Sequence, residues 1–547
     1  MVTGGAFVHE ALREAGITHV IGIPGRGTLP LDRRVRQDDD MTYVLARHET
    51  SIPYIAWGYY LASGRPAATV TIAGPGDTNA SNGLRNATID RVPIVHICSE
   101  VPPDQRGTGF IHEIDPDTFN DVVKINRDIT DPDGAPSAIR SGIEEALTQP
   151  LGPVRLGMPF LGDDLPEEST AITPERRKYD NSDEYERAAE ALADAERPVV
   201  YVGSDAKRSP GGPRAVQKVV ETLDAPVITS YAGKGAYPET DARWAGTTGA
   251  QLPAGTERLL EEADVVLALG VVFGGPTTRN GSFAMGETLI HVTSDPKFLG
   301  RRYQADIGIV DDIESACARF VDHIDASRSG WSGNTLGPAV REEYQAHIQD
   351  QGMFEDRSPA PTPAVVRTLR EQLPAETIVV ADIAEFRTWA MQLFEAPDPA
   401  AFIATGSWTS MGVGLPGAIG AKLGKPDRPV VCMTGDGGLF QCLEELHTAA
   451  DLGLDLTTVV FNNGHLAMIS TTPGLDDRFG WSTPPKYASL ADGLGWSYRE
   501  ASSPSEAGTA VNEAQEIDGP VLVDVKVDPD EPSSMDAWTY ESSIDFR

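Results

Sequence analysis

The chain contains a short apolar run that ends in glycines and an aspartate, Val430-Val431-Cys432-Met433-Thr434-Gly435-Asp436-Gly437-Gly438. A helical pattern over 439–450 follows, and then a strand pattern that ends in Phe461-Asn462-Asn463. Because ligands bind at the carboxyl edge of an open parallel sheet, we expect Asp436 and Asn463 to lie close together there. Their oxygens suit Mg²⁺, which also binds diphosphate and water. Either dipeptide alone would be read as a plain turn, whereas the ordered combination favours a site.

The same alternation of strands and helices extends through the rest of the chain. It predicts an α/β fold of three doubly wound parallel-sheet domains. Polar, acid- and proline-rich stretches separate them, which gives domains at 1–165, 185–325 and 360–530 and a polar tail at 531–547. The predicted strands are 20–23, 42–45, 68–72, 93–97, 199–202, 227–229, 265–269, 289–292, 377–380, 429–433, 457–461 and 521–525. The predicted helices of the first domain are 6–15, 49–61 and 77–89.

The composition is strongly acidic. The sequence has 81 acidic and 45 basic residues, a formal net charge of −36, and no basic patch. Such a surface repels phosphate backbones and anionic lipid, so we expect neither a nucleic-acid nor a membrane partner. Scattered carboxylates and scarce lysine resemble proteins adapted to molar salt, where this repulsion is screened. We therefore predict a halophilic source and instability at low salt.

The four cysteines form no C-x-x-C pair, and we predict that they are reduced and buried. The N-terminus has neither a basic region nor an apolar region of the kind found in secretory leaders, and no apolar run is long enough to span a membrane. These features predict a soluble, cytoplasmic protein.

Three stretches resemble one family of enzymes. Gly435-Asp436-Gly437, about 24 further residues and Asn462-Asn463 resemble the thiamine-diphosphate fingerprint. Residues 406–420 are similar to the segment that precedes it in the family of acetolactate synthase, pyruvate oxidase and benzoylformate decarboxylase. Arg47-His48-Glu49 and Gly74-Pro75-Gly76-Asp77-Thr78-Asn79 resemble that family's pyrimidine-binding domain. The resemblance implies a pyrimidine-binding, a central and a diphosphate-binding domain.

The resemblance also implies thiamine diphosphate and Mg²⁺ as cofactors. Glu49 would protonate N1′ of the aminopyrimidine, and Met411 would support the bent cofactor from beneath. Taken alone, Glu49 would be read as a helix cap and Met411 as helix packing. The implied metal-binding residues are Asp436, Asn463 and His465. The implied cofactor-binding residues are Glu49, Gly76, Asn79, Ser407, Met411, Gly435, Asp436, Gly437, Gly438, Asn463, His465 and Leu466.

Several positions depart from the family pattern on the substrate side. Glu100 and His112 stand where flavin-containing acetolactate synthases carry glutamine, and Ile72 stands where one decarboxylase subtype carries its histidine. We predict Glu49, His112, Glu100 and Arg26 as catalytic residues. Two interpretations of Arg26 stay open, a clamp for a second carboxylate and an exposed arginine that offsets local acid.

Segments that could bind two kinds of nucleotide depart from the corresponding sequence motifs. Thr247-Thr248-Gly249-Ala250 and Val272-Phe273-Gly274-Gly275-Pro276 differ from the flavin-contacting segments of the family, so we expect no bound FAD. In Gly74–Asn79 an asparagine replaces the last glycine of G-x-G-x-x-G, which disfavours a nicotinamide dehydrogenase.

The leading interpretation is an acetolactate synthase-like enzyme that decarboxylates a 2-oxo acid and ligates the product. The alternatives are a non-ligating 2-oxo acid decarboxylase and a catalytically silent cofactor-binding subunit. We expect a small 2-oxo acid or aldehyde as substrate. In the family the two cofactor-binding domains of one site come from different subunits, which implies a homodimer or homotetramer with sites at the subunit interface.

Overall fold

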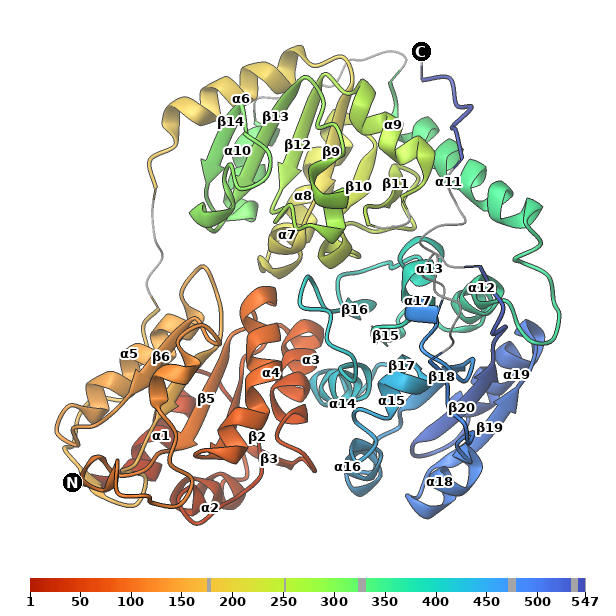
Figure 1. The fold of residues 1–547 in the computed structure, drawn as a ribbon. Helices are drawn as coiled ribbons and strands as arrows, with labels where there is room; N and C mark the ends of the chain where they lie inside the picture. Colours follow the sequence, from red (N-terminus) through yellow and green to blue (C-terminus); the bar gives the residue numbers. More distant parts are fainter. Residues whose placement is uncertain (175–178, 250–251, 323–330, 471–478, 533–539, 547) are drawn as a thin grey trace.

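A computed structural model describes residues 1–174, 179–249, 252–322, 331–470, 479–532 and 540–546 (Figure 1). It contains three six-stranded parallel sheets, each covered by helices. The three-domain α/β prediction is therefore confirmed. A two-stranded antiparallel pair, β1 (Val2–Thr3) with β8 (Asp164–Leu165), ties the start of the chain to the end of the first domain.

The N-terminal domain has the strand order β3-β2-β4-β5-β7-β6. Its central strands are runs of β-branched and aliphatic residues that are buried on both faces, as parallel sheets require. Its strands are β2 (His19–Gly22), β3 (Thr42–Leu45), β4 (Ala67–Ile72), β5 (Ile94–Ser99), β6 (Ile125–Asp128) and β7 (Val154–Gly157). Its helices are α1 (Gly4–Glu14), α2 (Leu29–Gln37), α3 (Ser51–Ser63), α4 (Pro75–Asp90) and α5 (Ala135–Leu147).

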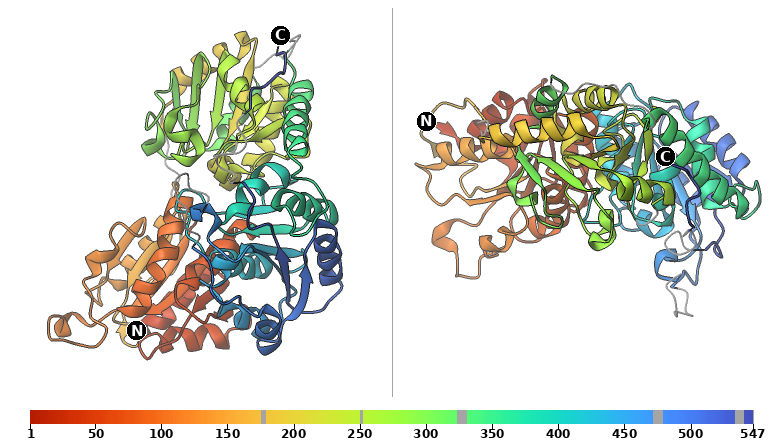
Figure 2. Two further views of the ribbon diagram at one scale, coloured as in Figure 1. Left: turned by 45° about the vertical axis from the view of Figure 1, so that its right-hand side comes forward. Right: turned by 90° about the horizontal axis from the view of Figure 1, so that it is seen from above.

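The central domain has the strand order β11-β10-β9-β12-β13-β14. Its strands are β9 (Pro198–Val202), β10 (Val227–Thr229), β11 (Trp244–Thr247), β12 (Val265–Leu269), β13 (Thr288–Thr293) and β14 (Ile307–Val310). Its helices are α6 (Ser182–Asp194), α7 (Ser204–Arg208), α8 (Gly212–Leu223), α9 (Ala254–Glu262), α10 (Ile313–Val321) and α11 (Gly333–Asp350). Figure 2 shows that this domain lies across the other two.

The C-terminal domain has the strand order β16-β15-β17-β18-β20-β19. Its strands are β15 (Ile378–Ala381), β16 (Phe402–Ala404), β17 (Val430–Gly435), β18 (Thr457–Asn462), β19 (Ser497–Ala501) and β20 (Val521–Lys526). Its helices are α12 (Thr362–Gln372), α13 (Glu385–Leu393), α14 (Gly414–Gly424), α15 (Asp436–Leu439), α16 (Glu445–Asp451), α17 (Ala467–Ser470), α18 (Tyr487–Gly493) and α19 (Pro504–Gln515).

Helices α3 and α14 join the first and last domains (Figure 1). Helix α3 is apolar on all sides, which is typical of a fully buried helix. The two backbones touch, because a Cβ on Gly58 would lie 2.0 Å from the Gly417 carbonyl oxygen and one on Gly420 would lie 1.9 Å from that of Ile55. Glycine is therefore required at these crossing points, and the N- and C-terminal domains share one apolar core.

The four cysteines, Cys98, Cys317, Cys432 and Cys442, are buried and unpaired, as predicted. The polar tail returns to the central domain, where Arg258 donates to the carbonyls of Ser542 and Ile544 and Phe546 is buried. No helix in the described part of the chain combines the length and apolar character that a membrane span requires.

The predicted helix over 439–450 is wrong in extent. The structure has a single turn, α15, and then the separate helix α16. Tertiary contacts set this break, since the buried Glu445 carboxylate accepts the backbone N–H groups of Arg47 at 3.0 Å and His48 at 3.1 Å. Likewise the predicted helix over 49–61 begins two residues later, at Ser51, and Glu49 lies in the turn that precedes it.

Candidate functional site

A pocket of about 240 Å³ lies at the carboxyl ends of β17 and β18. Asp436 follows β17 directly and Asn463 follows β18, so the sheet brings together the two side chains that the sequence predicts at one edge. Met411 also lines the pocket. The other predicted residues on its wall are Gly435, Gly437, Gly438, His465 and Leu466.

Asp436 is held by N–H groups. Its Oδ1 accepts the Gly437 N–H at 2.8 Å, and its Oδ2 accepts the Gly464 N–H at 2.9 Å and the Trp481 Nε1–H at 3.1 Å. Burial raises the pKa of Asp436, although these bonds oppose the shift. Among the described residues no lysine or arginine nitrogen lies within 4 Å of this carboxylate. A bound cation would remove the cost of burying it.

Asn463 and His465 form the other side of the pocket. The Asn463 side-chain oxygen accepts the His465 backbone N–H at 3.2 Å, and His465 Nδ1 lies 3.1 Å from the Asn463 carbonyl oxygen. A carboxylate and an amide oxygen are the hard donors that Mg²⁺ prefers. Gly437 keeps the wall open, because a Cβ there would lie 2.9 Å from Leu466 Cδ2 and 3.3 Å from Met411 Cε. These residues fit a metal-bound diphosphate.

Sequence reasoning missed Asp382, which holds the pocket loops together. This fully buried carboxylate follows β15 and accepts the Gly412 N–H at 3.0 Å and the Thr434 hydroxyl at 3.0 Å. It thereby fixes the loop that carries Met411 against the end of β17. Burial raises its pKa. A carboxylate directly after an apolar strand was the signal that could have identified it.

Glu49 lies in the N-terminal domain, beside the Gly74–Asn79 loop. Its Oε2 accepts the Asn79 side-chain N–H at 3.1 Å, and a Cβ on Gly76 would lie 3.7 Å from its Oε1. The structure thus brings together three of the predicted residues, Glu49, Gly76 and Asn79. No residue of the N-terminal domain lines the pocket beside Asp436. Ser407 lines a second pocket instead.

The remaining predicted catalytic residues are dispersed. His112 is exposed, and its backbone lies against Gly74, where a Cβ would be 2.6 Å from the His112 carbonyl oxygen. Arg26 is exposed on the loop that follows β2. Glu100 is buried and pairs with Arg155. Of the two eroded flavin segments, 272–274 lines the second pocket, whereas Ala250 lies outside the described residues.

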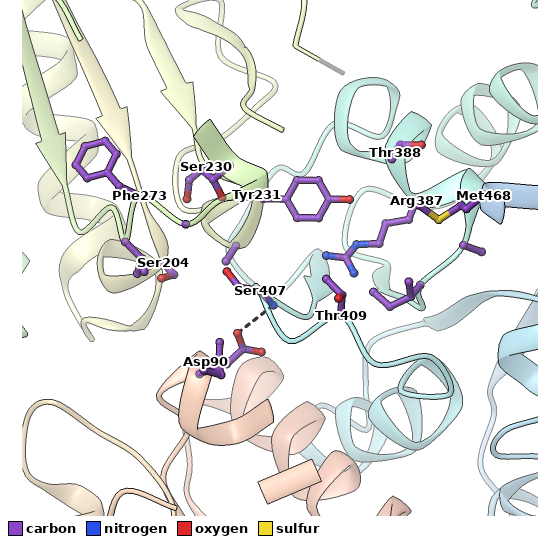
Figure 3. A pocket seen from close by; sticks show the side chains of 18 residues that line it. Asp90, Ser204, Ser230, Tyr231, Phe273, Arg387, Thr388, Ser407, Thr409 and Met468 are labelled. Carbon is purple, nitrogen blue, oxygen red and sulfur yellow. Dashed lines mark hydrogen bonds between the residues drawn. The ribbon is translucent and has the colours of Figure 1, made fainter. Parts of the chain in front are cut away.

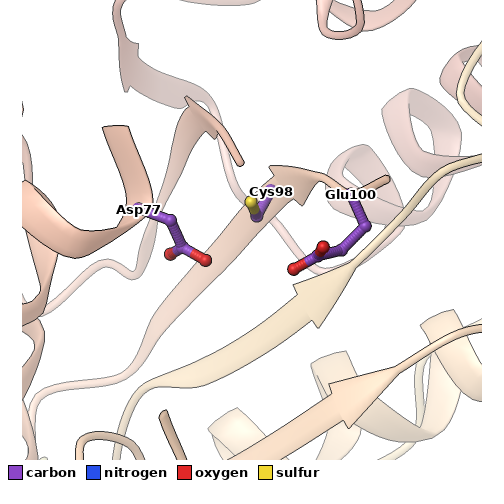
Figure 4. A group of neighbouring side chains, drawn as sticks. All are labelled: Asp77, Cys98 and Glu100. Atoms are coloured by element: carbon purple, nitrogen blue, oxygen red, sulfur yellow. The ribbon is translucent and has the colours of Figure 1, made fainter. Parts of the chain in front are cut away.

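A buried group of Asp77, Cys98 and Glu100 has its ligand atoms close enough to hold a metal ion (Figure 4). A cation is already present, however. The Arg155 guanidinium donates to Asp77 at 2.7 Å and also to Glu100, while His96 Nε2 lies 2.9 Å from Asp77. Burial alone would raise the pKa of Asp77, but His96 and Arg155 outweigh it and lower this pKa. We interpret the group as an internal ion-pair network.

Comparisons with known proteins identify one family for the three domains. Three domains of one family match the chain: "Thiamine pyrophosphate enzyme, N-terminal TPP binding domain" at residues 2–120, the central domain at 185–320 and the "C-terminal TPP binding domain" at 382–525. The chain therefore belongs to the thiamine pyrophosphate enzyme family.

Within that family the chain is similar to acetolactate synthase subunits. It is 28% identical to a "Probable acetolactate synthase large subunit" of Methanococcus aeolicus, over 98% of this chain and 93% of that protein. It is 28% identical to the "Acetolactate synthase large subunit" of Corynebacterium glutamicum, over 97% and 87%. It is 26% identical to the "Acetolactate synthase isozyme 1 large subunit" of Escherichia coli, over 97% and 94%.

Proposed function

We propose that this protein is a thiamine-diphosphate- and Mg²⁺-dependent enzyme that decarboxylates a 2-oxo acid and joins the remaining fragment to a second carbonyl compound. The buried Asp436 carboxylate, which lacks a cationic partner among the described residues and faces a glycine-walled pocket, carries the proposal. When bound, thiamine diphosphate would supply a nucleophilic carbon for the 2-oxo group and a cationic thiazolium ring as the acceptor of the electron pair that decarboxylation releases.

The residues of the chain have distinct tasks in this proposal. Asp436 and Asn463 bind Mg²⁺ through their side-chain oxygens, and His465 completes the predicted set. Gly437 and Gly438 let the backbone approach the diphosphate. Glu49 holds a proton for the aminopyrimidine, and the Asn79 amide keeps its carboxylate oriented.

Product analysis tests the reaction. The protein is purified in molar KCl, supplied with thiamine diphosphate, Mg²⁺ and ¹³C-pyruvate, and its products are identified by NMR. We expect acetolactate. Acetaldehyde alone would instead support the non-ligating decarboxylase. An absence of consumption with pyruvate and with larger 2-oxo acids would favour the silent subunit and contradict the proposal.

We expect the site to include a second copy of the chain, a proposal supported by the absence of Glu49 from the described lining of the pocket that contains Asp436. We expect a homodimer in which each site combines Asp436 of one subunit with Glu49 of the other. Glu49→Gln should bind the cofactor yet lower turnover by about 10²- to 10⁴-fold, the usual contribution of a general acid–base group. Unchanged turnover would show that Glu49 has another role.

Mixing two inactive variants tests the shared site directly. Glu49→Gln and Asp436→Ala subunits, unfolded and refolded together, should regain about one quarter of the wild-type activity, because half of the dimers are mixed and each has one native site. Each variant refolded alone is the control. If the mixture stays inactive while sedimentation shows mixed dimers, the site lies within one chain.

A further inference from the structure

A second cavity, of about 260 Å³, lies where the three domains meet (Figure 3). We call it the junction pocket. The carboxyl ends of β9, β10 and β12 in the central domain and of β15 and β16 in the C-terminal domain open into it. It shares Ile383, Ala384 and Met468 with the pocket beside Asp436. A molecule in the junction pocket would therefore adjoin the proposed cofactor.

The junction pocket contains a buried arginine with an incomplete set of partners. Arg387, on α13, is 2% exposed, and its guanidinium projects among Tyr231, Ser407 and Thr409 (Figure 3). It donates to the Thr405 hydroxyl at 3.1 Å and to the Thr405 carbonyl, and it stacks on the Tyr231 ring at 4.6 Å. Its Nε has no hydrogen-bond partner in the described part of the chain.

Arg387 is attracted to the buried carboxylate of Asp90 but forms no ion pair with it. Within the described residues no carboxylate oxygen lies within 4 Å of its guanidinium. The other charged residue on the wall, Asp90, is already satisfied, because it accepts the Trp57 Nε1–H at 2.9 Å and the Gly406 N–H at 3.0 Å and lies 3.7 Å from Arg208. A buried, unpaired guanidinium is costly, and an anion in the pocket would offset that cost.

The rest of the wall limits the kind of anion. Apolar side chains such as Ile89, Val272, Phe273 and Ile383 alternate on it with the hydroxyl side chains of serines and threonines, and Arg387 is its one cationic side chain among the described lining residues. One guanidinium suits a single carboxylate rather than a polyphosphate, and the apolar part of the wall suits an apolar body attached to that carboxylate. Phe273 and Thr409 both have φ of 52°, which is uncommon for non-glycine residues and is found more often at binding sites.

We propose that Arg387 binds the carboxylate of the second substrate, a 2-oxo monocarboxylic acid with an apolar side chain, in the junction pocket. The inference rests on the proposed function and names the substrate that its ligation step consumes. The first 2-oxo acid loses its carboxylate as CO₂, whereas the second keeps its own throughout. Only the second substrate therefore gains from a fixed cation, and Arg387 acts as a positioning and specificity residue.

Binding of an unreactive acid tests the inference without cofactor or turnover. Titration calorimetry compares 3-phenylpropanoate with 3-phenylpropanamide, which has the same apolar body and no charge. We expect wild-type protein to bind the acid at least about tenfold more tightly, as expected of a charge-assisted hydrogen bond. Equal binding of the two compounds, or no binding of either, would overturn the inference whatever the variants do.

Three variants locate the acid. Arg387→Gln should abolish the preference for the acid. Arg387→Lys should keep part of it, because lysine retains the positive charge but lacks the paired N–H donors of the guanidinium. Arg26→Gln should leave the preference unchanged. A preference that survives Arg387→Gln, or that is lost in Arg26→Gln instead, would overturn the assignment.

Cofactor affinity keeps this test separate from the proposed function. Wild-type and Arg387→Gln proteins should bind thiamine diphosphate and Mg²⁺ equally, and the variant should show a raised KM for the second substrate. If wild-type protein binds no thiamine diphosphate, the proposed function fails even where the acid binds. If it binds the cofactor but does not prefer the acid, only the role of Arg387 fails.

Discussion

Two buried aspartates lie in the first turns of helices that follow parallel strands, yet their surroundings differ. Asp77, after β4, lies among His96 and Arg155 and has its charge compensated inside the N-terminal domain. Asp436, after β17, accepts three N–H groups and pairs with no lysine or arginine in the described structure. Burial raises the pKa of Asp436, whereas the cationic partners lower that of Asp77.

The difference shows how to separate a structural carboxylate from one that awaits a ligand. If the distance between possible metal ligands were the only criterion, the candidate metal site would be Asp77, Cys98 and Glu100, but there Arg155 already supplies the cation. If the criterion is a buried carboxylate without a cationic partner in the described structure, the candidate metal-binding residue is Asp436. Arg387 is the cationic counterpart of Asp436, since it too is buried without an ion pair in the described structure. We therefore expect mutations around Asp77 to change stability and mutations of Asp436 to change binding.

The largest effect on stability should come from Arg155→Met. The substitution leaves Asp77 and Glu100 buried without their cation, and breaking a buried pair in this way costs about 3–5 kcal/mol. Chemical denaturation in molar KCl measures the free energy of unfolding. The matched control is Arg106→Met, which removes the more exposed pair with Asp128 and should cost less than about 1 kcal/mol. Equal costs would contradict the comparison.

Asp436→Ala should have the next largest effect, on binding rather than on stability. Loss of residues that only orient a metal ligand weakens metal binding by about 10- to 100-fold, so loss of the ligand itself should reach the upper end of that range or exceed it. Calorimetry with thiamine diphosphate, with and without Mg²⁺, measures this. Arg155→Met, where it folds, should keep the Mg²⁺-dependent affinity. Mg²⁺-dependent binding that survives in Asp436→Ala would place the metal elsewhere.

The sequence predicted the sheets better at their centres than at their edges. The strands that it missed include β6, β11, β14, β16 and β19, each at the edge of its sheet. Edge strands pair on one side only and need fewer apolar residues, so their pattern is weaker. Strand β7 is interior but carries the buried Arg155, whose charge interrupts the apolar run.

The site shows the same limit. Asp436 and Asn463 could be predicted because each directly follows a strong strand, and the sheet fixes their neighbourhood. Arg387 could not, since it lies on a helix and its importance depends on a cavity formed by three domains. Glu100 resembles a site residue by position, but its pairing with Arg155 joins strands whose contact no local pattern reveals.

A smaller effect should come from Glu531, near the pocket residue Thr362. The residue is only partly buried, but its Oε1 is inaccessible and has no hydrogen-bond partner among the described residues, and its Oε2 accepts the Thr362 N–H at 2.9 Å. Burial raises the pKa of Glu531 to about 7 from an ordinary value of 4.5. The folded state then binds more protons than the unfolded state between these values, so the free energy of unfolding falls as pH rises from about 4.5 to 7.

In Glu531→Gln the side chain is neutral at every pH. The fall in the free energy of unfolding between pH 4.5 and 7 should therefore be smaller than in the wild type by about 1–2 kcal/mol, a value that allows for the partial exposure of the residue. Denaturation midpoints of both proteins at pH 5 and pH 8 measure the difference. Parallel pH profiles would show that the carboxylate is ionised throughout and that its burial has little consequence.

The smallest effect per residue should be the change of the melting temperature with salt concentration, which acts on the acidic surface. This salt dependence distinguishes the surface charges from the buried ion-pair network around Asp77. With a net charge of −36, the folded chain repels itself at low ionic strength, and salt shortens the range of that repulsion from about 30 Å at 0.01 M to about 3 Å at 1 M. We expect the melting temperature of the wild type to rise with KCl. Because Asp77 and Arg155 are inaccessible to ions, the penalty of Arg155→Met should stay constant across the same KCl series. A wild-type melting temperature independent of KCl would contradict a halophilic adaptation, and a penalty that shrinks with salt would show that ions reach the network around Asp77.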